Sequence, residues 1–143
     1  VKVVGRRFAF EYIRQRLETF WARNGRIAVT DVANGFYLVR FESLTDMTAA
    51  KDEGPWVVQN HYLSVKEWSP DFDPALETID LVKTWVKLPG FPPEFVKTKL
   101  LVDVGNLIGR FIRMDAVATK IARGRYTRIC VEIDLSKGLE VHS

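Results

Sequence analysis

The first third of the chain alternates between strand-like and helix-like patterns of apolar residues. Residues 1–5 are short and rich in valine, which favours a strand. Residues 8–23 carry apolar side chains every three or four positions, which predicts a helix with one apolar face: Phe10, Ile13, Leu17, Phe20 and Trp21. Asn24 and Gly25 follow, and we expect one of them to end this helix in the left-handed conformation.

Two strands are predicted next, over residues 26–32 and 36–42, because Ala33-Asn34-Gly35 between them contains the Asn-Gly pair typical of hairpins. Ser43 and Asp46 have the spacing of a helix N-cap, so we expect a short helix from there to about residue 52. A last extended pair, 56–58 and 62–68, flanks a turn at Gln59-Asn60. The resulting order of strands and helices, βαββαβ, is that of a ferredoxin-like fold.

The second half has a related but shorter pattern. Residues 70–80 are polar and contain prolines and aspartates, which predicts a linker between a 1–69 half and an 81–143 half. A strand is expected at 81–88, a helix at 94–108, and two strands at 110–119 and 126–135, joined by a basic turn at 120–125. We therefore predict an α+β protein in which a βαββ extension packs on a ferredoxin-like, βαββαβ half to form one compact unit.

The composition is typical of a folded domain, and its net charge is compatible with binding a polyanion. The 143 residues are 47% hydrophobic and 12% aromatic, enough to form a core, and no apolar run reaches the roughly 18 residues that a membrane span needs. A net charge of +3 permits a nucleic-acid partner without requiring one. The single cysteine, Cys130, indicates a reducing compartment, so we expect the nucleus or the cytoplasm. The chain starts at Val1 without a signal peptide, as expected of a fragment of a longer protein.

One strand is similar to the central strand of an RNA recognition motif. That motif runs basic-Gly-aromatic-small-aromatic-Val-x-aromatic, and the chain reads NGFYLVRFES from Asn34 to Ser43. Phe36 matches a base-stacking aromatic of the motif. Asn34 replaces its basic residue, Tyr37 its small residue and Leu38 its second stacking aromatic. The alternative is that this stretch is only a hydrophobic central strand.

Five further phrases, in their order and spacing, resemble a plant domain of unknown function, DUF4283: GPW, WSPDF, TWVKLPGFPPEF, NLIGRFIRMD and RYTRICVEIDL. The resemblance extends from the helix with Trp21 to Leu135. It implies a LINE-type retrotransposon, gag-like protein that binds nucleic acid, in which a CCHC zinc knuckle commonly follows this domain. The knuckle is absent from this sequence, and Cys130, His61 and His142 do not make a Cys/His zinc site, so we expect no cofactor here.

Strand alternation assigns candidate binding residues to the sheet face that the helices leave open. In the first half, Tyr37, Val39 and Phe41 are expected to face the core, which leaves Phe36 and Arg40 on the other face. Flat rings on such a face stack on unpaired bases, while cations neutralise phosphates.

The second half offers a denser candidate surface. Alternation places Lys83, Trp85 and Lys87 outward on one strand and Tyr126 and Arg128 outward on another. If these strands are neighbours, rings and cations lie side by side, which suits single-stranded nucleic acid. The alternative is a Trp85 that is buried under a loop or against the first half.

A third candidate is the basic turn at 120–125, in which Arg123 and Arg125 precede Arg128. A glycine-containing basic loop suits a phosphate clamp, although a solvated loop has the same composition.

No catalytic constellation is visible in the sequence, since His61, His142 and Cys130 have no suitable partner nearby. We therefore expect a non-enzymatic protein that binds single-stranded RNA or DNA with low sequence specificity. The alternative is a module for protein interaction or self-association, in which an exposed apolar patch forms the docking surface. That patch would consist of Phe36, Leu38, Tyr62 and Trp68.

Overall fold

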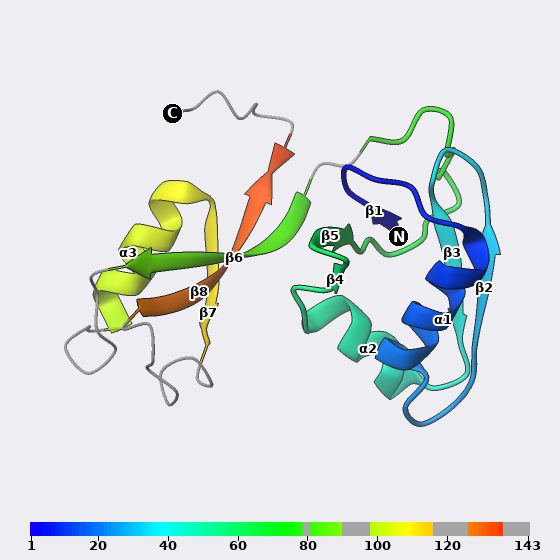
Figure 1. The fold of residues 1–143 in the computed structure, drawn as a ribbon, viewed down its shortest axis with the longest axis horizontal. Coiled ribbons are helices and arrows are strands. Elements are labelled where there is room, and N and C mark those ends of the chain that lie inside the picture. The colour runs from blue at the N-terminus through cyan, green and yellow to red at the C-terminus, as the bar shows by residue number, and fades with distance from the viewer. Residues whose placement is uncertain (79–80, 90–97, 116–125, 136–143) are drawn as a thin grey trace. The chain divides into compact units, whose positions relative to one another are not determined.

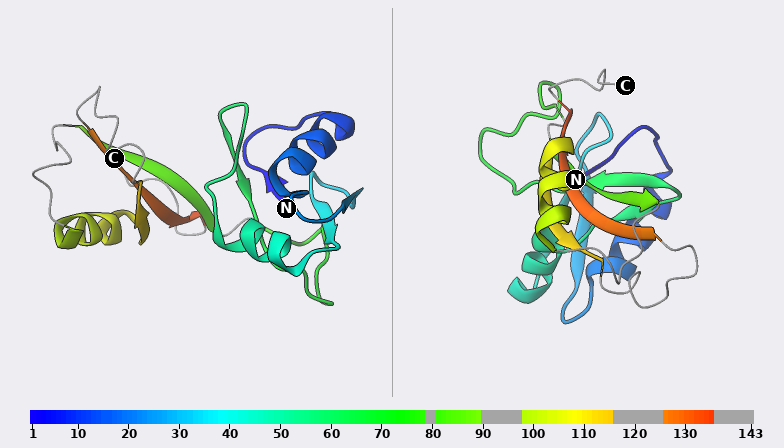
Figure 2. Two further views of the ribbon diagram at one scale, coloured as in Figure 1. Left: turned by 90° about the horizontal axis from the view of Figure 1, so that it is seen from below. Right: turned by 90° about the vertical axis from the view of Figure 1, so that its left-hand side faces the viewer.

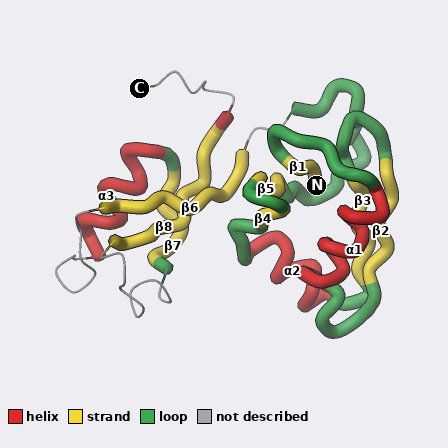
Figure 3. The backbone as a smooth tube through the Cα atoms, viewed as in Figure 1, coloured by secondary structure: helices red, strands yellow, loops and turns green. Residues whose placement is uncertain are grey.

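A computed structural model divides the chain into two units, Val1–Ile79 (unit 1) and Asp80–Ser143 (unit 2). The structure describes residues 1–78, 81–89, 98–115 and 126–135. Helices and strands are interspersed along this part of the chain (Figure 3), and the strands form antiparallel sheets. This confirms the predicted α+β class.

Unit 1 contains five short strands and two helices among its described residues (Figure 1). In chain order they are β1 (Lys2–Val3), α1 (Phe10–Trp21), β2 (Ile27–Asp31), β3 (Tyr37–Phe41), α2 (Leu44–Asp52), β4 (Val57–Val58) and β5 (His61–Ser64). Strand β5 pairs with β1 and β4, and β2 pairs with β3, all antiparallel. A bridge between Lys2 and Phe36 joins β1 to the start of β3, and the nearby Tyr37 N–H donates to the Val1 carbonyl at 2.8 Å.

Both hairpin turns lie where the sequence predicted them. Ala33, Asn34 and Gly35 have φ values of 91°, 55° and 80°, and Gln59 and Asn60 have φ values of 45° and 68°. Glycine and asparagine enter this left-handed region at the lowest cost, so Asn34, Gly35 and Asn60 favour these two turns locally, whereas Ala33 and Gln59 adopt it at a higher cost.

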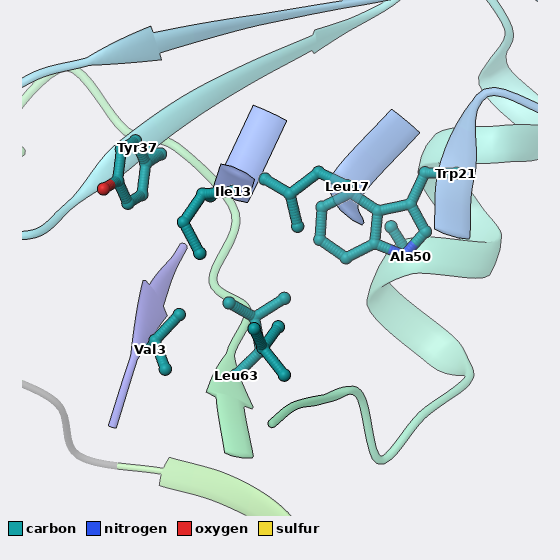
Figure 4. Close-up of a cluster of buried hydrophobic side chains, with 8 residues drawn as sticks. Val3, Ile13, Leu17, Trp21, Tyr37, Ala50 and Leu63 are labelled. Carbon is teal, nitrogen blue, oxygen red and sulfur yellow. The ribbon is translucent and has the colours of Figure 1, made fainter. Parts of the chain in front are cut away.

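The core of unit 1 forms around the apolar stripe of α1. Ile13, Leu17 and Trp21 are fully buried, as the three- and four-residue spacing predicted, and Figure 4 shows them facing side chains from β1, β3, α2 and β5. Tyr37 of β3 and Leu63 of β5 are buried in the same cluster. The helices therefore cover the face of β3 that strand alternation assigned to the core.

The buried carboxylate of Asp46 ties α2 to the end of α1. Its oxygens accept hydrogen bonds from the Asn24 N–H (2.9 Å), the Asn24 Nδ2 (2.8 Å) and the Gly25 N–H (3.1 Å). Ser43 caps α2 as predicted, since its hydroxyl accepts from the Asp46 N–H at 3.2 Å. Neither Asn24 nor Gly25 has a positive φ, so the expected left-handed end of α1 was wrong. These two residues serve instead as donors to Asp46.

The segment after β5 folds back onto β3 and forms part of unit 1. The rings of Phe72 and Phe36 meet edge to face at 5.3 Å between centroids. The Asn34 Nδ2 donates to the Pro74 carbonyl at 2.9 Å, and the loop lies beside the β2–β3 hairpin (Figure 1). The described residues of the predicted 70–80 linker, up to 78, belong to unit 1, where Phe72 and Pro74 make these contacts.

Unit 2 has the predicted βαββ order: β6 (Leu81–Pro89), α3 (Thr98–Ile108), β7 (Arg110–Met114) and β8 (Tyr126–Asp134). The strands form one antiparallel sheet, with β8 between β6 and β7. Helix α3 lies along one face of this sheet (Figure 2). No helix in the described part of the chain is both long enough and apolar enough to span a membrane.

Two glycines allow the α3 segment to approach the sheet closely. A Cβ on Gly105 of α3 would lie 2.9 Å from the Phe111 Cβ, and Leu101, one turn earlier, is buried against Ile129 and Val131 of β8. A Cβ on Gly109 would lie only 2.3 Å from the carbonyl oxygen of Glu132. Gly109 is therefore required where α3 ends because any side chain would collide with the backbone of β8.

We expect Gly109→Ala to destabilise unit 2 by about 1–3 kcal/mol, because the added methyl group meets backbone that cannot move aside. Urea denaturation followed by the methyl NMR signals of Ile129 and Val131 measures this loss. Gly25→Ala is the control, since its methyl group would meet the side chain of Glu42 in unit 1. Equal urea midpoints for Gly109→Ala and the wild type would contradict the steric account.

Burial by itself would raise the pKa of the Asp46 carboxyl, but the hydrogen bonds from Asn24 and Gly25 outweigh it and lower the pKa below its usual value. The lowered pKa stabilises unit 1 above the unfolded-state pKa of about 3.9, and this stabilisation is lost as the pH falls through the folded-state pKa. We expect Asp46→Asn to lower the thermal midpoint at pH 7 and to weaken its dependence on pH below about 4. Parallel pH profiles for the two proteins would contradict this role.

Candidate functional site

The pairing of β6 with β8 gathers most of the candidate residues of unit 2 on the sheet face opposite α3. Lys83 lies opposite Glu132, Trp85 opposite Cys130, and Lys87 opposite Arg128. Inward-facing Val86 and Ile129 pack toward α3 from the other face, as alternation predicted. We call this surface the Trp85 face: Lys83, Trp85, Lys87, Arg110, Arg113, Asp115, Arg128, Cys130 and Glu132.

Two guanidinium groups lie against the indole of Trp85. The Cζ of Arg128 is 4.2 Å from the ring centroid, and the Cζ of Arg113 is 5.7 Å from it. These distances are typical of cation–π contacts, in which the ring quadrupole attracts a positive charge. The Trp85 side chain is half-buried rather than fully enclosed. The face therefore combines an aromatic ring with cations that are already ordered beside it.

Two carboxylates on the Trp85 face are each paired with an arginine. The Nε of Arg128 donates to the Asp115 Oδ2 at 2.7 Å, and the Arg110 guanidinium donates to the Glu132 Oε1 at 3.0 and 3.2 Å. Five cations and two carboxylates leave an excess of positive charge on this face. Such an excess favours a polyanionic ligand.

Cys130 lies at the centre of the Trp85 face and is fully buried. Burial raises the pKa of its thiol, while the positive charges of Arg113 and Lys83 oppose the rise only in part. Cys130 is therefore a neutral thiol at pH 7, and it lies opposite Trp85 in the pairing of β6 with β8.

The candidates of unit 1 are arranged differently. Phe36 lies on the sheet face expected for it, but its side chain is only 7% exposed because Phe72 covers it. The Lys2 Nζ also lies over the Phe36 ring, 4.7 Å from the centroid. The expectation of an open ring at Phe36 is thus corrected, whereas Arg40 on β3 is exposed as expected.

The remaining candidates fall at the edge of the described chain. Arg123 and Arg125 lie outside the described residues. For Tyr126 the structure describes the backbone, which pairs with that of Pro89 at the end of β6.

Sequence reasoning missed the contributions of Arg110, Arg113 and Asp115 to this surface. Strict alternation places residues three positions apart on opposite faces of a strand. A register shift between Phe111 and Arg113 inserts one extra residue in β7, so that Arg110 and Arg113 point to the same face. The sequence carries no clear signal for such a bulge. Asp115 reaches Arg128 only because β7 pairs with β8.

The described residues contain no group of three or more histidine, cysteine, aspartate or glutamate side chains arranged to hold a metal ion. The Trp85 face carries ammonium and guanidinium groups and an indole ring beside its two carboxylates.

Comparison with known proteins places unit 1 in a family. No curated protein and no solved structure matches the chain. A family model described as a domain of unknown function, DUF4283, matches residues 1–76, which is more than half of the chain and ends before β6. The helices, hairpins and Phe72 loop of unit 1 all lie within this match. The chain therefore belongs to the DUF4283 family.

Proposed function

We propose that this protein binds single-stranded RNA or DNA on the Trp85 face and catalyses no reaction. The observation that carries the proposal is the position of Trp85 between cationic side chains from three strands. Arg128 and Arg113 lie against its ring, and Lys83 and Lys87 flank it along β6. Ring and cations together match the two parts of a single strand, its bases and its phosphates.

The chemistry of this face favours low sequence specificity. Rings and guanidinium planes stack on any base, and ammonium groups attract any phosphate. Reading the edges of bases requires hydrogen-bonding groups that are free to face them. The carboxylates of Asp115 and Glu132 point instead at Arg128 and Arg110. We therefore propose binding that depends strongly on salt and weakly on base identity.

We further propose that unit 1 has the ferredoxin-like arrangement of an RNA recognition motif. The βαββα element order, the Lys2–Phe36 bridge and the pairing of β1 with β5 support a continuous order β5-β1-β3-β2. Membership in the DUF4283 family, together with the phrases of the second half, supports a plant retroelement-derived, gag-like protein of the nucleus or cytoplasm.

Self-association is a second candidate function because α3 exposes apolar side chains away from its buried residues. Leu107 is 87% exposed, and Leu100 and Ile108 are 43% and 45% exposed. Exposed apolar side chains that cluster on one element often mark a contact with another protein. The sheet patch expected for this role is less suitable, because Phe36 is buried while Trp68 is exposed.

We expect Trp85→Leu to weaken binding of a fluorescent single-stranded RNA of mixed sequence by about 5- to 150-fold, which corresponds to the loss of one stacked base at about 1–3 kcal/mol. Lys87→Ala should lower the affinity and reduce the salt slope, d log K/d log[salt], by about 0.7, because one phosphate contact is lost. Fluorescence anisotropy at a series of salt concentrations measures both effects.

Lys99→Ala is the matched control for Lys87→Ala. It removes the same charge from α3, on the other side of the sheet, where the Lys99 side chain is 86% exposed. We expect its affinity and salt slope to stay near those of the wild type. Equal effects of the Lys87 and Lys99 substitutions would show that net charge, rather than the Trp85 face, governs binding.

If self-association is the function, the mass measured by sedimentation equilibrium should rise with protein concentration, and Leu107→Ser should abolish the rise by removing the most exposed apolar side chain of α3. A monomeric wild type at all concentrations would contradict this candidate. RNA binding by that monomer would favour the first proposal.

A further inference from the structure

We propose that Asp115 is a positioning residue of the Trp85 face, which holds the guanidinium of Arg128 against the indole before a ligand binds. Trp85 and Arg128 then form one composite platform on which a nucleobase stacks. This inference rests on the proposed function and assigns a role to a negative charge on a surface that binds a polyanion.

Asp115 contacts Arg128 through both backbone and side chain. The Asp115 N–H donates to the Arg128 carbonyl at 2.9 Å, which fixes the end of β7 beside β8. The Arg128 Nε donates to the Asp115 Oδ2 at 2.7 Å, and a second guanidinium nitrogen, Nη2, pairs with the same oxygen. The Asp115 side chain is 9% exposed and that of Arg128 is 31% exposed. The carboxylate therefore faces the guanidinium rather than the solvent.

This geometry restricts the motion of a long side chain. A free arginine samples many rotamers, and ordering it on binding reduces affinity. In this structure the carboxylate holds one edge of the Arg128 guanidinium, whose Cζ lies 4.2 Å from the centroid of the Trp85 ring. Guanidinium planes stack on bases as aromatic rings do. Asp115 thus lowers the ordering cost of a stacking surface.

Charge repulsion alone would make Asp115 lower the affinity for nucleic acid, since a carboxylate repels phosphates. Two features reduce that repulsion: the Asp115 side chain is buried, and the Arg128 guanidinium pairs with it directly. Glu132 makes the contrasting pair. The side chain of its partner Arg110 is 67% exposed, and among the described residues this guanidinium pairs with Glu132. Removing the charge of Glu132 should therefore favour binding, whereas removing that of Asp115 should weaken it.

The test compares Asp115→Asn with Glu132→Gln in the full chain, since each substitution removes one negative charge from the same face. The probes are a fluorescent single-stranded DNA of mixed sequence and an abasic strand of equal length. We expect Asp115→Asn to weaken binding of the base-containing strand by about 2- to 10-fold, the cost of ordering one side chain. Binding of the abasic strand should not weaken. Glu132→Gln should tighten binding of both strands.

Arg128→Lys provides a second route to the same question, because lysine keeps the charge but offers neither a flat face nor two donors for Asp115. We expect it to lose affinity only for the base-containing strand. In the double variant, Asp115→Asn should add little to that loss, because each residue acts through the other. Thermal midpoints of the free proteins identify any variant that is unfolded. If Asp115→Asn is unfolded, the binding of the two strands by Arg128→Lys tests the positioning role instead.

Tighter binding of the base-containing strand by Asp115→Asn, as by Glu132→Gln, would overturn the positioning role and leave the proposed function intact. Equal losses on both strands would overturn it as well, since a general weakening involves no stacking platform. Absence of binding by the wild type at low salt would overturn the proposed function itself, and the role of Asp115 with it.

Discussion

The antiparallel pairing of β6 with β8 is the interaction on which unit 2 depends. It runs without interruption from Leu81 opposite Asp134 to Pro89 opposite Tyr126. Because side chains alternate along both strands, this register gives one apolar face, which α3 covers, and one face with Trp85 and its cations. A slip of one residue in β6 would send Val86 to the polar face and Trp85 toward α3. Burial of the apolar face and assembly of the candidate site are therefore consequences of the same register.

In unit 1, the sheet face that points away from the helices is arranged differently. There the ring of Phe36, the most motif-like residue of the whole sequence, is enclosed by Phe72 and Lys2. In unit 2 the aromatic candidate Trp85 is flanked by guanidinium groups and is half-buried. The resemblance of the central strand to an RNA recognition motif favours unit 1 as the binding site. Strand alternation already favoured unit 2, and the arrangement of the Trp85 ring and its cations supports that choice.

The features that could be predicted from the sequence are those determined by residues close together in the chain. The buried α1 stripe of Ile13, Leu17 and Trp21, the Asn34-Gly35 turn and the Ser43 cap were located correctly, because each depends on spacing within a few positions. Phe10, which was expected on the same stripe, is exposed at the start of α1. The features that were missed join distant segments. Asp46 accepts hydrogen bonds from residues more than twenty positions away in the sequence. Phe72 contacts Phe36, from which it is separated by almost half the length of unit 1. The bulge that places Arg110 and Arg113 on one face depends on pairing with β8, which local spacing does not encode.

The central claim is that a single strand of nucleic acid meets unit 2 on the face opposite α3. Two-dimensional ¹H–¹⁵N NMR spectra recorded during titration with a short single-stranded RNA test it residue by residue. The account predicts that the indole N–H of Trp85 and the backbone signals of Lys87 and Arg128 shift together with one affinity. Signals of the outward-facing α3 residues Lys99 and Asp103 should stay in place. Shifts confined to α3 or to unit 1, with the Trp85 indole unchanged, would contradict the account.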